Sequence, residues 1–220
     1  MIDKKNPTIV QMVVVLLLIA VICSAGVAAI YDATKDTIAQ QKAEKEQASL
    51  KLVLPDHDND PVKDAVTIKL NGQEYQCYVA KKGGQPVGYA VKAGNMNGYN
   101  GHVEVLTGFQ PDGTIINSQA TVLAETPGLG QKAIEPKYHD QFNGKNPNAF
   151  HLWVKKDERD GKKGDVDAIS AATITSRAYA QAVQTAYDAL MTHLGKPVEA
   201  HSGATGTNQN ANEGAIDKDK

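Results

Sequence analysis

The chain carries no charged residue between Asn6 and Tyr31, and the segment from Thr8 to Ile30 is almost entirely aliphatic. A helix of residues 8–30 rises about 34 Å at roughly 1.5 Å per residue, which is enough to cross a hydrocarbon core of about 30 Å. The sequence therefore predicts one transmembrane helix at 8–30, preceded by a short cytoplasmic segment at 1–7. A cleaved signal peptide is the alternative, although the apolar region exceeds the usual length of about 7 to 15 residues of a signal core.

The charges on the two sides of this helix indicate its orientation. Lys4 and Lys5 lie on the short N-terminal side, whereas Asp32, Lys35 and Asp36 nearly balance one another on the other side. Because positive charge is retained on the cytoplasmic side, the N-terminus is expected inside the cell. The remaining chain is then expected on the outer, periplasmic face of a bacterial cytoplasmic membrane.

Composition beyond the membrane helix predicts one globular domain on a stalk. Residues 31–60 are rich in Lys, Glu and Gln, and Pro55 is expected to end a helical stalk there. Residues 61–196 are expected to form the folded domain, and residues 197–220 a flexible polar tail. The net charge of −2 and the lack of a basic run argue against nucleic acid as a partner.

Short β-rich runs separated by turn residues predict antiparallel hairpins in the first half of this domain. The runs are Tyr75–Ala80, Pro86–Ala93, His102–Phe109 and Thr114–Leu123, with Gly83-Gly84, Asn95–Gly98 and Pro111–Gly113 between them and Phe150–Lys155 as a possible further strand. A stretch without Gly or Pro from Ala171 to Leu194 predicts a helix covering one face of the sheet. The expected fold class is α+β: a single N-terminal transmembrane helix followed by an exported domain with an antiparallel sheet and packing helices.

Neither metal binding nor independent catalysis is expected. The six histidines form no pair at metal-binding spacing and no cysteine stands near one, so no metal site is predicted. No G-x-S-x-G elbow or P-loop lysine is present, so no catalytic residue is assigned. Of the two cysteines, only Cys77 lies outside the membrane helix, where it is expected to be a buried strand residue.

The segment DAISAAT, Asp167 to Thr173, precedes the predicted helix. Ser170 stands where a helix N-cap is expected, and Thr173 then falls in the first helical turn. Free backbone N–H groups and the helix dipole favour an anion there, so a phosphate on the Thr173 hydroxyl would be stabilised. An ordinary capped helix is the alternative interpretation of the same spacing.

This segment resembles the flavin-attachment motif Asp-x-x-Ser/Thr-Gly-Ala-Thr of a membrane redox family. The family includes the G subunit of the Rnf electron-transport complex and the C subunit of the sodium-pumping NADH:quinone reductase. The resemblance implies FMN attached covalently to Thr173 as a phosphoester by a flavin transferase. Ala171 departs from the motif because it replaces Gly, and a positive φ at this position would strain its methyl group.

A second segment, Glu125 to Gly130, is similar to the ETPGLG segment of the same family, which lies against the flavin. Read alone, Gly128 to Ala133 could pass for a dinucleotide-binding G-x-G-x-x-A, but Pro136 leaves no room for the helix such a site requires. Tyr99, between Gly98 and Gly101, resembles the family's glycine-aromatic turn, and its ring could stack on isoalloxazine.

The expected cofactor-binding residues combine these segments with two further hydroxyls. Thr175 and Ser176 could hydrogen-bond phosphate oxygens or the preceding backbone. The full set is Thr173 as the covalent FMN acceptor, with Ser170, Ala172, Thr175, Ser176, Glu125, Thr126, Gly128, Leu129 and Tyr99. A second SGAT, at Ser202–Thr205, is expected to be a decoy because the polar tail offers no core around it.

The resemblance implies a membrane-anchored electron-transfer subunit of an Rnf-type, ion-translocating ferredoxin:NAD oxidoreductase, not catalytic alone. Its expected partners are the membrane, the other membrane subunits of the redox complex and, during maturation, the flavin transferase. The C subunit of the quinone reductase is the nearest alternative. A flavin-free, membrane-tethered interaction module is an alternative of another class.

Overall fold

The computed structural model describes residues 9–159 and 161–196. The expected segment 1–7, the tail 197–220 and the SGAT sequence at Ser202–Thr205 lie outside these residues. The chain divides into two compact units, Met1–Gln47 and Ala48–Lys220.

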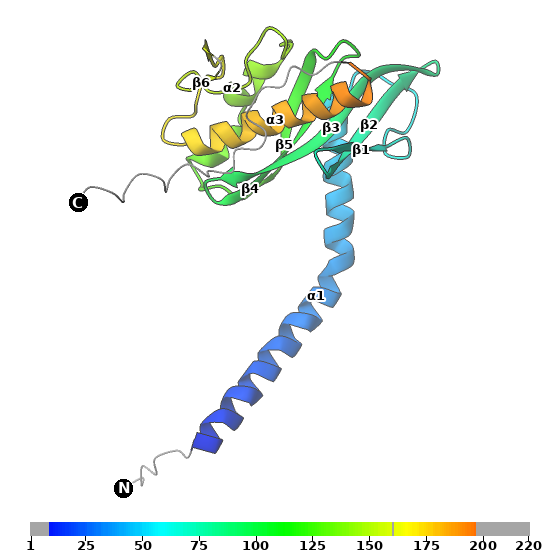
Figure 1. The fold of residues 1–220 in the computed structure, drawn as a ribbon. Helices are drawn as coiled ribbons and strands as arrows, with labels where there is room; N and C mark the ends of the chain where they lie inside the picture. The colour runs from blue at the N-terminus through cyan, green and yellow to red at the C-terminus, as the bar shows by residue number, and fades with distance from the viewer. Residues whose placement is uncertain (1–8, 160, 197–220) are drawn as a thin grey trace, which may run out of the picture. The chain divides into compact units, whose positions relative to one another are not determined.

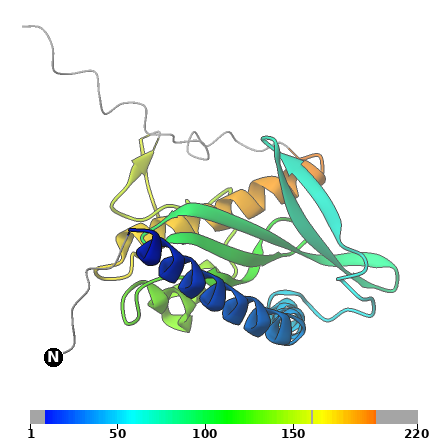
Figure 2. The same cartoon turned by 90° about the horizontal axis from the view of Figure 1, so that it is seen from below.

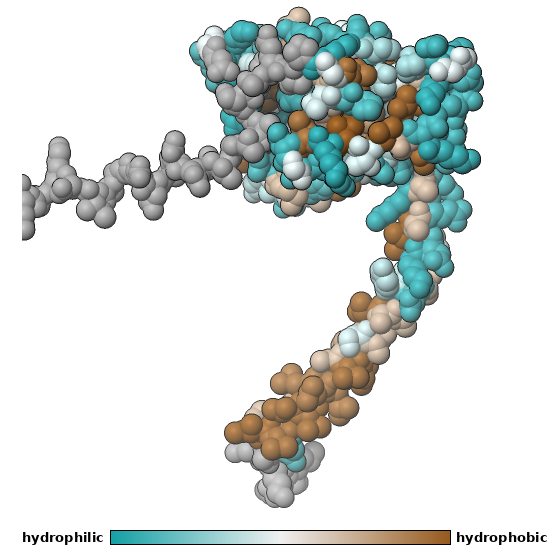
Figure 3. Space-filling model, turned by 45° about the vertical axis from the view of Figure 1, so that its right-hand side comes forward, coloured by the Kyte–Doolittle hydropathy of each residue, from teal (hydrophilic) through white to brown (hydrophobic). Residues whose placement is uncertain are grey.

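One long helix, α1 (Ile9–Val53), accounts for the first described part of the chain (Figure 1). Its first half presents aliphatic side chains to the outside, and Figure 3 shows them as a continuous hydrophobic band. With a mean hydropathy of 3.0 over its most apolar window, the helix is long and apolar enough to cross a membrane. It continues through the Lys-, Glu- and Gln-rich segment and ends at Val53, just before Pro55, which cannot continue a helix.

A five-stranded antiparallel sheet forms the centre of the second unit. Its strands are β1 (Val66–Leu70), β2 (Gln73–Lys82), β3 (Gln85–Gly98), β4 (Gly101–Phe109) and β5 (Ile115–Leu123), in the spatial order β1-β2-β3-β4-β5. Each strand pairs with the next, as a chain of short turns requires. Asn71 and Gly72 both have positive φ, the turn geometry that joins β1 and β2 tightly.

The two faces of the sheet are covered by different helices. On one face lies α3 (Thr173–His193), which runs along the strands in Figures 1 and 2. Alternation along β2 places Cys77 and Val79 in the cluster under α3, whereas Tyr78 and Ala80 belong to a cluster with Leu50 and Val53 of α1. The predicted α+β layering, with a helix on one face of an antiparallel sheet, is confirmed.

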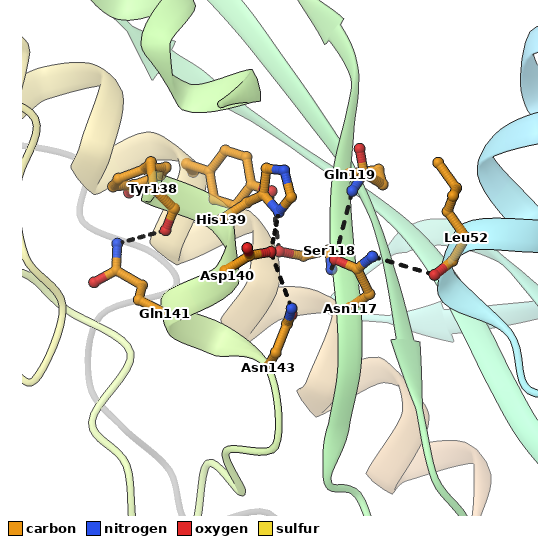
Figure 4. Close-up of polar contacts among 10 residues, drawn as sticks. Leu52, Asn117, Ser118, Gln119, Tyr138, His139, Asp140, Gln141 and Asn143 are labelled. Carbon is orange, nitrogen blue, oxygen red and sulfur yellow. Dashed lines mark hydrogen bonds and ion pairs between the residues drawn. The ribbon is translucent and has the colours of Figure 1, made fainter. Parts of the chain in front are cut away.

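The end of α1 lies in close contact with the second face. A Cβ added at Gly108 would clash with the carbonyl group of Val53, and one at Gly88 would stand 2.5 Å from Pro55. Figure 4 shows Asn117 of β5 reaching the end of the same helix, where its amide donates a hydrogen bond of 3.2 Å to the Leu52 carbonyl. The last turn of α1 is therefore part of the folded unit.

Irregular structure connects β5 to α3. It contains two short 3-10 helices and one short α-helix, namely η1 (Gly130–Ile134), α2 (Pro136–His139) and η2 (Asp140–Phe142), and then a small hairpin of β6 (Glu158–Arg159) and β7 (Lys162–Lys163). In Figure 4, Asp140 accepts a hydrogen bond from the Asn143 amide at 3.1 Å, which ties η2 to the following residues.

Two sequence predictions about this domain are wrong, and one strand was missed. Phe150–Lys155 forms no strand; only Val154 makes an isolated bridge, with Val166. Asn95–Gly98 is not a separator, because β3 continues to Gly98 and turns only after it. The short strand β1 was not predicted, although Asn71-Gly72 after an alternating run is a hairpin signal.

Candidate functional site

The loop before α3 turns back sharply, and the helix begins later than predicted. The Ala172 N–H bonds to the Ile169 carbonyl at 3.0 Å, and Ala171 has a φ of 61°. The helix therefore starts at Thr173 and not at Ala171, and Ser170 is not its N-cap. The prediction failed because burial of Ile169 in the core, and not a capping hydroxyl, sets where the chain turns.

Ser176, in the first turn of the helix, holds this loop through two hydrogen bonds. Its hydroxyl accepts a hydrogen bond from the Ile169 N–H and donates one to the Ala172 carbonyl, both at 2.9 Å. Of the two expected roles, the hydroxyl therefore serves the preceding backbone. Ser176 is fully buried and does not line the pocket at this end of α3.

The first turn of α3 has backbone N–H groups without an intrahelical acceptor. The Ser176 N–H is the one that reaches the Ala172 carbonyl, and no side chain caps the helix within the described residues. The N–H groups of Thr173, Ile174 and Thr175 thus lack an intrahelical partner, as at any helix start. Together with the helix dipole they form a favourable environment for an anion.

A pocket of about 470 Å³ lies at this end of α3. It is lined by Tyr99, Glu125, Thr126, Leu129, Gly130, Ala171, Ala172, Thr173, Ile174 and Thr175. The structure thereby brings together the two segments singled out in the sequence and the tyrosine of the β3–β4 turn. The volume lies within the range of about 300–1,000 Å³ usual for small-molecule and cofactor sites.

Apolar groups form the rim of this pocket. Tyr99, Leu129 and Ile174 are all exposed although hydrophobic. Such side chains suit a flat aromatic ligand, because burying them against it removes apolar surface from water.

Glu125 links its own loop, after β5, to the β3–β4 turn on the inner side of the pocket. Only 4% of the residue is exposed, and its Oε1 accepts a hydrogen bond from the Tyr99 N–H at 2.8 Å. Gly130 lies against it, since a Cβ there would stand 2.7 Å from the Glu125 Cβ. The last glycine of the ETPGLG segment is therefore required by close packing.

Thr175 contributes an unpaired polar atom to the same pocket. The residue is 1% exposed, and its Oγ1 has no hydrogen-bond partner among the described residues. Leaving a buried hydroxyl unpaired costs about 1–3 kcal/mol, so this atom is suited to a partner that the protein chain does not itself provide. The orphaned hydroxyl, the free helix start and the apolar rim together fit FMN.

Not every expected residue lies at this pocket. Gly128 lies in the loop with a φ of 75° but is not part of the lining. Ser170 is exposed and lines a neighbouring pocket of about 290 Å³ together with Lys132 and Asp167. Asp167 is held there by an ion pair of 2.9 Å with Lys155. Gly130, Ala171 and Ile174 line the pocket without being predicted from the sequence, although each stands inside or next to one of the two motifs.

Comparisons with known proteins match two separate regions of the chain. The family model for the FMN-binding domain matches residues 98–188, and the model for the RnfG N-terminal region matches residues 1–53. These two regions include α1 and every residue that lines the pocket.

Three relatives of this chain are each named as the G subunit of an oxidoreductase complex. The G subunit of the Na⁺-translocating ferredoxin:NAD⁺ oxidoreductase complex of Acetobacterium woodii is 34% identical over 148 residues, covering 67% of this chain and 70% of the relative. The G subunit of the ion-translocating oxidoreductase complex of Shewanella baltica is 35% identical over 196 residues, with 83% and 89% covered. The G subunit of the proton-translocating ferredoxin:NAD⁺ oxidoreductase complex of Clostridium ljungdahlii is 31% identical, with 88% and 97% covered.

Among solved structures, the chain is similar to the C subunit of the Na⁺-translocating NADH-quinone reductase from Parabacteroides distasonis. The identity is 25% and the TM-score 0.43, with 64% of this chain and 70% of that chain covered.

Proposed function

This chain belongs to the RnfG family, the G subunits of ion-translocating oxidoreductase complexes, and on that premise we propose that it is an electron-transfer subunit carrying FMN as a phosphoester on Thr173. The observation that supports this most strongly is the position of Thr173. It is the first residue of α3 and lines a pocket whose other wall includes Glu125, Thr126, Leu129 and Gly130.

Exposure distinguishes Thr173 from the neighbouring hydroxyls. Thr175 and Ser176 are buried, and the Ser176 hydroxyl is already engaged with the backbone. Ser170 is exposed but lines the other pocket. Thr173 is half-buried, lines the larger pocket, and has a side chain that takes no capping role, so its hydroxyl is the one best placed for a transferase to modify.

Different residues around Thr173 are proposed to contact different parts of the cofactor. The N–H groups of the first turn of α3 would stabilise the phosphate, while Tyr99, Leu129 and Ile174 would shield the ring system from water. Thr126 supports the opposite wall, because its carbonyl accepts the Leu129 N–H at 3.2 Å. When bound, FMN supplies reversible electron transfer, and the protein supplies orientation and electrostatics.

The remaining features suit a membrane subunit. We propose that residues 8–30 span the membrane, that 31–60 form the stalk and linker, and that 61–196 form the FMN-binding domain on the outer face. Lys4 and Lys5 support a cytoplasmic N-terminus. The relatives are named as subunits of complexes, so the proposed partners are other membrane subunits, with a flavin transferase acting during maturation.

Mass spectrometry of the full-length chain co-expressed with a flavin transferase tests the proposal. Trypsin releases Gly164–Arg177 as one peptide, and fragment ions within it separate Thr173 from Ser170 and Thr175. The expected result is FMN minus water on Thr173, absent in Thr173→Val and retained in Thr175→Val. An unmodified chain, with the transferase active on a known acceptor, would favour the flavin-free interaction module.

A further inference from the structure

One carboxylate oxygen in the pocket is already used, and the other remains free. Glu125 Oε1 accepts the Tyr99 N–H at 2.8 Å, whereas Oε2 has no hydrogen-bond donor within residues 9–159 and 161–196. The same residues place no Lys, Arg or His in an ion pair with this carboxylate. Glu125 is 4% exposed and lines the pocket, so a partner that enters there can use its second oxygen as an acceptor.

Two glycines make room for this carboxylate. A Cβ at Gly98 would stand 2.7 Å from Glu125 Oε1, and a Cβ at Gly130 would stand 2.9 Å from Oε2. Any side chain at either position would displace the carboxylate. The carboxylate therefore occupies space that glycine leaves open at both positions.

The orphaned hydroxyl of Thr175 and the free carboxylate oxygen of Glu125 both face Gly130. The same Cβ position at Gly130 is 2.8 Å from Thr175 Oγ1 and 2.9 Å from Glu125 Oε2, so the two atoms flank one point. One is an acceptor without a donor, and the other is a hydroxyl that can donate. Both residues line the pocket.

We propose that Glu125 and Thr175 form a recognition pair for the pyrimidine edge of the flavin ring, Glu125 accepting from its N3–H and Thr175 donating to an adjacent ring carbonyl. This inference rests on the proposed function. The edge of the ring offers an N–H donor between two carbonyl acceptors, which matches one acceptor and one donor side by side. A phosphate does not match, because a buried carboxylate repels it.

The pair has opposite effects on the reduction potential. Reduced flavin carries more negative charge than oxidised flavin, so the Glu125 carboxylate disfavours reduction and lowers the potential. A hydrogen bond from Thr175 to a ring carbonyl stabilises the added charge and raises the potential. The two residues therefore set the potential by opposing contributions.

Spectroelectrochemical titration of the flavin-loaded, full-length protein tests the pair. Glu125→Gln keeps an acceptor for the Tyr99 N–H and removes the charge, so the potential should rise. Thr175→Val keeps the shape and removes the donor, so the potential should fall, with Thr175→Ser restoring it. Matched controls are Glu104→Gln, a carboxylate that bonds Thr121 outside this pocket, and Thr107→Val, a second buried threonine with an unpaired hydroxyl.

The outcomes separate this inference from the proposed function. Loading is first measured by mass on the Gly164–Arg177 peptide; a wild-type chain without flavin there contradicts the proposed function itself. Given a loaded chain, opposite shifts in the two pocket variants and none in the controls support the pair. Shifts of the same sign, no shift, or equal shifts in the controls would overturn it.

Discussion

Tyr179 of α3 donates a hydrogen bond of 3.0 Å from its hydroxyl to Ser118 Oγ of β5, and both residues are fully buried. The bond joins the helix that carries Thr173 to the sheet. Burial raises the pKa of the Tyr179 hydroxyl, so it remains a donor throughout the physiological range. A second tyrosine anchors the site to the core, since Tyr138 donates a hydrogen bond of 3.0 Å to the Ser176 carbonyl and packs edge-on against Tyr179.

Removing one partner of the Tyr179–Ser118 pair is expected to cost more than removing both. Tyr179→Phe leaves the Ser118 hydroxyl unpaired and should lower the free energy of unfolding by about 1–3 kcal/mol. Adding Ser118→Ala should recover part of that loss, which denaturant unfolding of the four chains in detergent would measure as a coupling. Strictly additive losses would mean that the bond contributes nothing.

Gly108→Ala is expected to separate the end of α1 from the sheet. The new methyl group would clash with the Val53 carbonyl group, so the backbone must move. Overpacking of this kind typically costs about 1–3 kcal/mol of stability. The group in the way is a backbone carbonyl, which cannot rotate aside as a side chain can. Gly26→Ala is the control, because nothing lies within 4 Å of its added Cβ. Equal thermal stability of the two variants would contradict the close contact.

Ala171→Gly is expected to stabilise the loop, unlike most Ala-to-Gly changes. Ala171 has a φ of 61°, and a non-glycine residue there carries about 1–2 kcal/mol of strain that glycine would relieve. Glycine also has more conformational freedom in the unfolded chain, which offsets about 0.5–1 kcal/mol of this gain. Ala182→Gly, within α3, should instead destabilise by about 1 kcal/mol. The prediction fails if both substitutions lower the melting temperature.

Cys77 is expected to make stability fall at high pH. Burial raises the pKa of its thiol from the ordinary 9.0 to about 12. The unfolded chain therefore loses this proton at a lower pH than the native chain, so the stabilisation is complete below pH 9 and is lost as the pH rises towards 12.

A comparison with Cys77→Ala, in a Cys23→Ser background, isolates this effect from the buried tyrosines, whose pKa values are also raised. The difference in unfolding free energy between the two chains should shrink above pH 9, and iodoacetamide should label Cys77 only after unfolding. Rapid labelling of the native chain would contradict the assignment.

The sequence predicted the parts of this fold that local patterns determine. The apolar run indicated α1, Pro55 marked its end, and alternation between glycine turns indicated four of the five strands. The sequence predicts a cap at Ser170 because Ser is a common N-cap, whereas burial of Ile169 moves the helix start to Thr173. Phe150–Lys155 is apolar because it packs on the core, not because it pairs in the sheet.

The site was predictable as a set of motifs but not as a set of contacts. Glu125, Thr173 and Tyr99 carried recognisable local signals, and the structure brings them to one pocket. The unpaired state of Thr175 and the clearance at Gly130 depend on residues far apart in the chain, and no local pattern encodes them.

The hydrogen bond between the Ile169 N–H and Ser176 Oγ also fixes the number of residues between the buried loop and the helix. Successive residues of an α-helix are turned by about 100° around its axis. With Ile169 held in the core and Ser176 held to it, deleting a single residue between them would rotate the threonine away from the pocket while leaving every side chain type in place. The site therefore depends on the spacing of the motif as much as on its chemistry, and insertions or deletions there should be tolerated less well than substitutions.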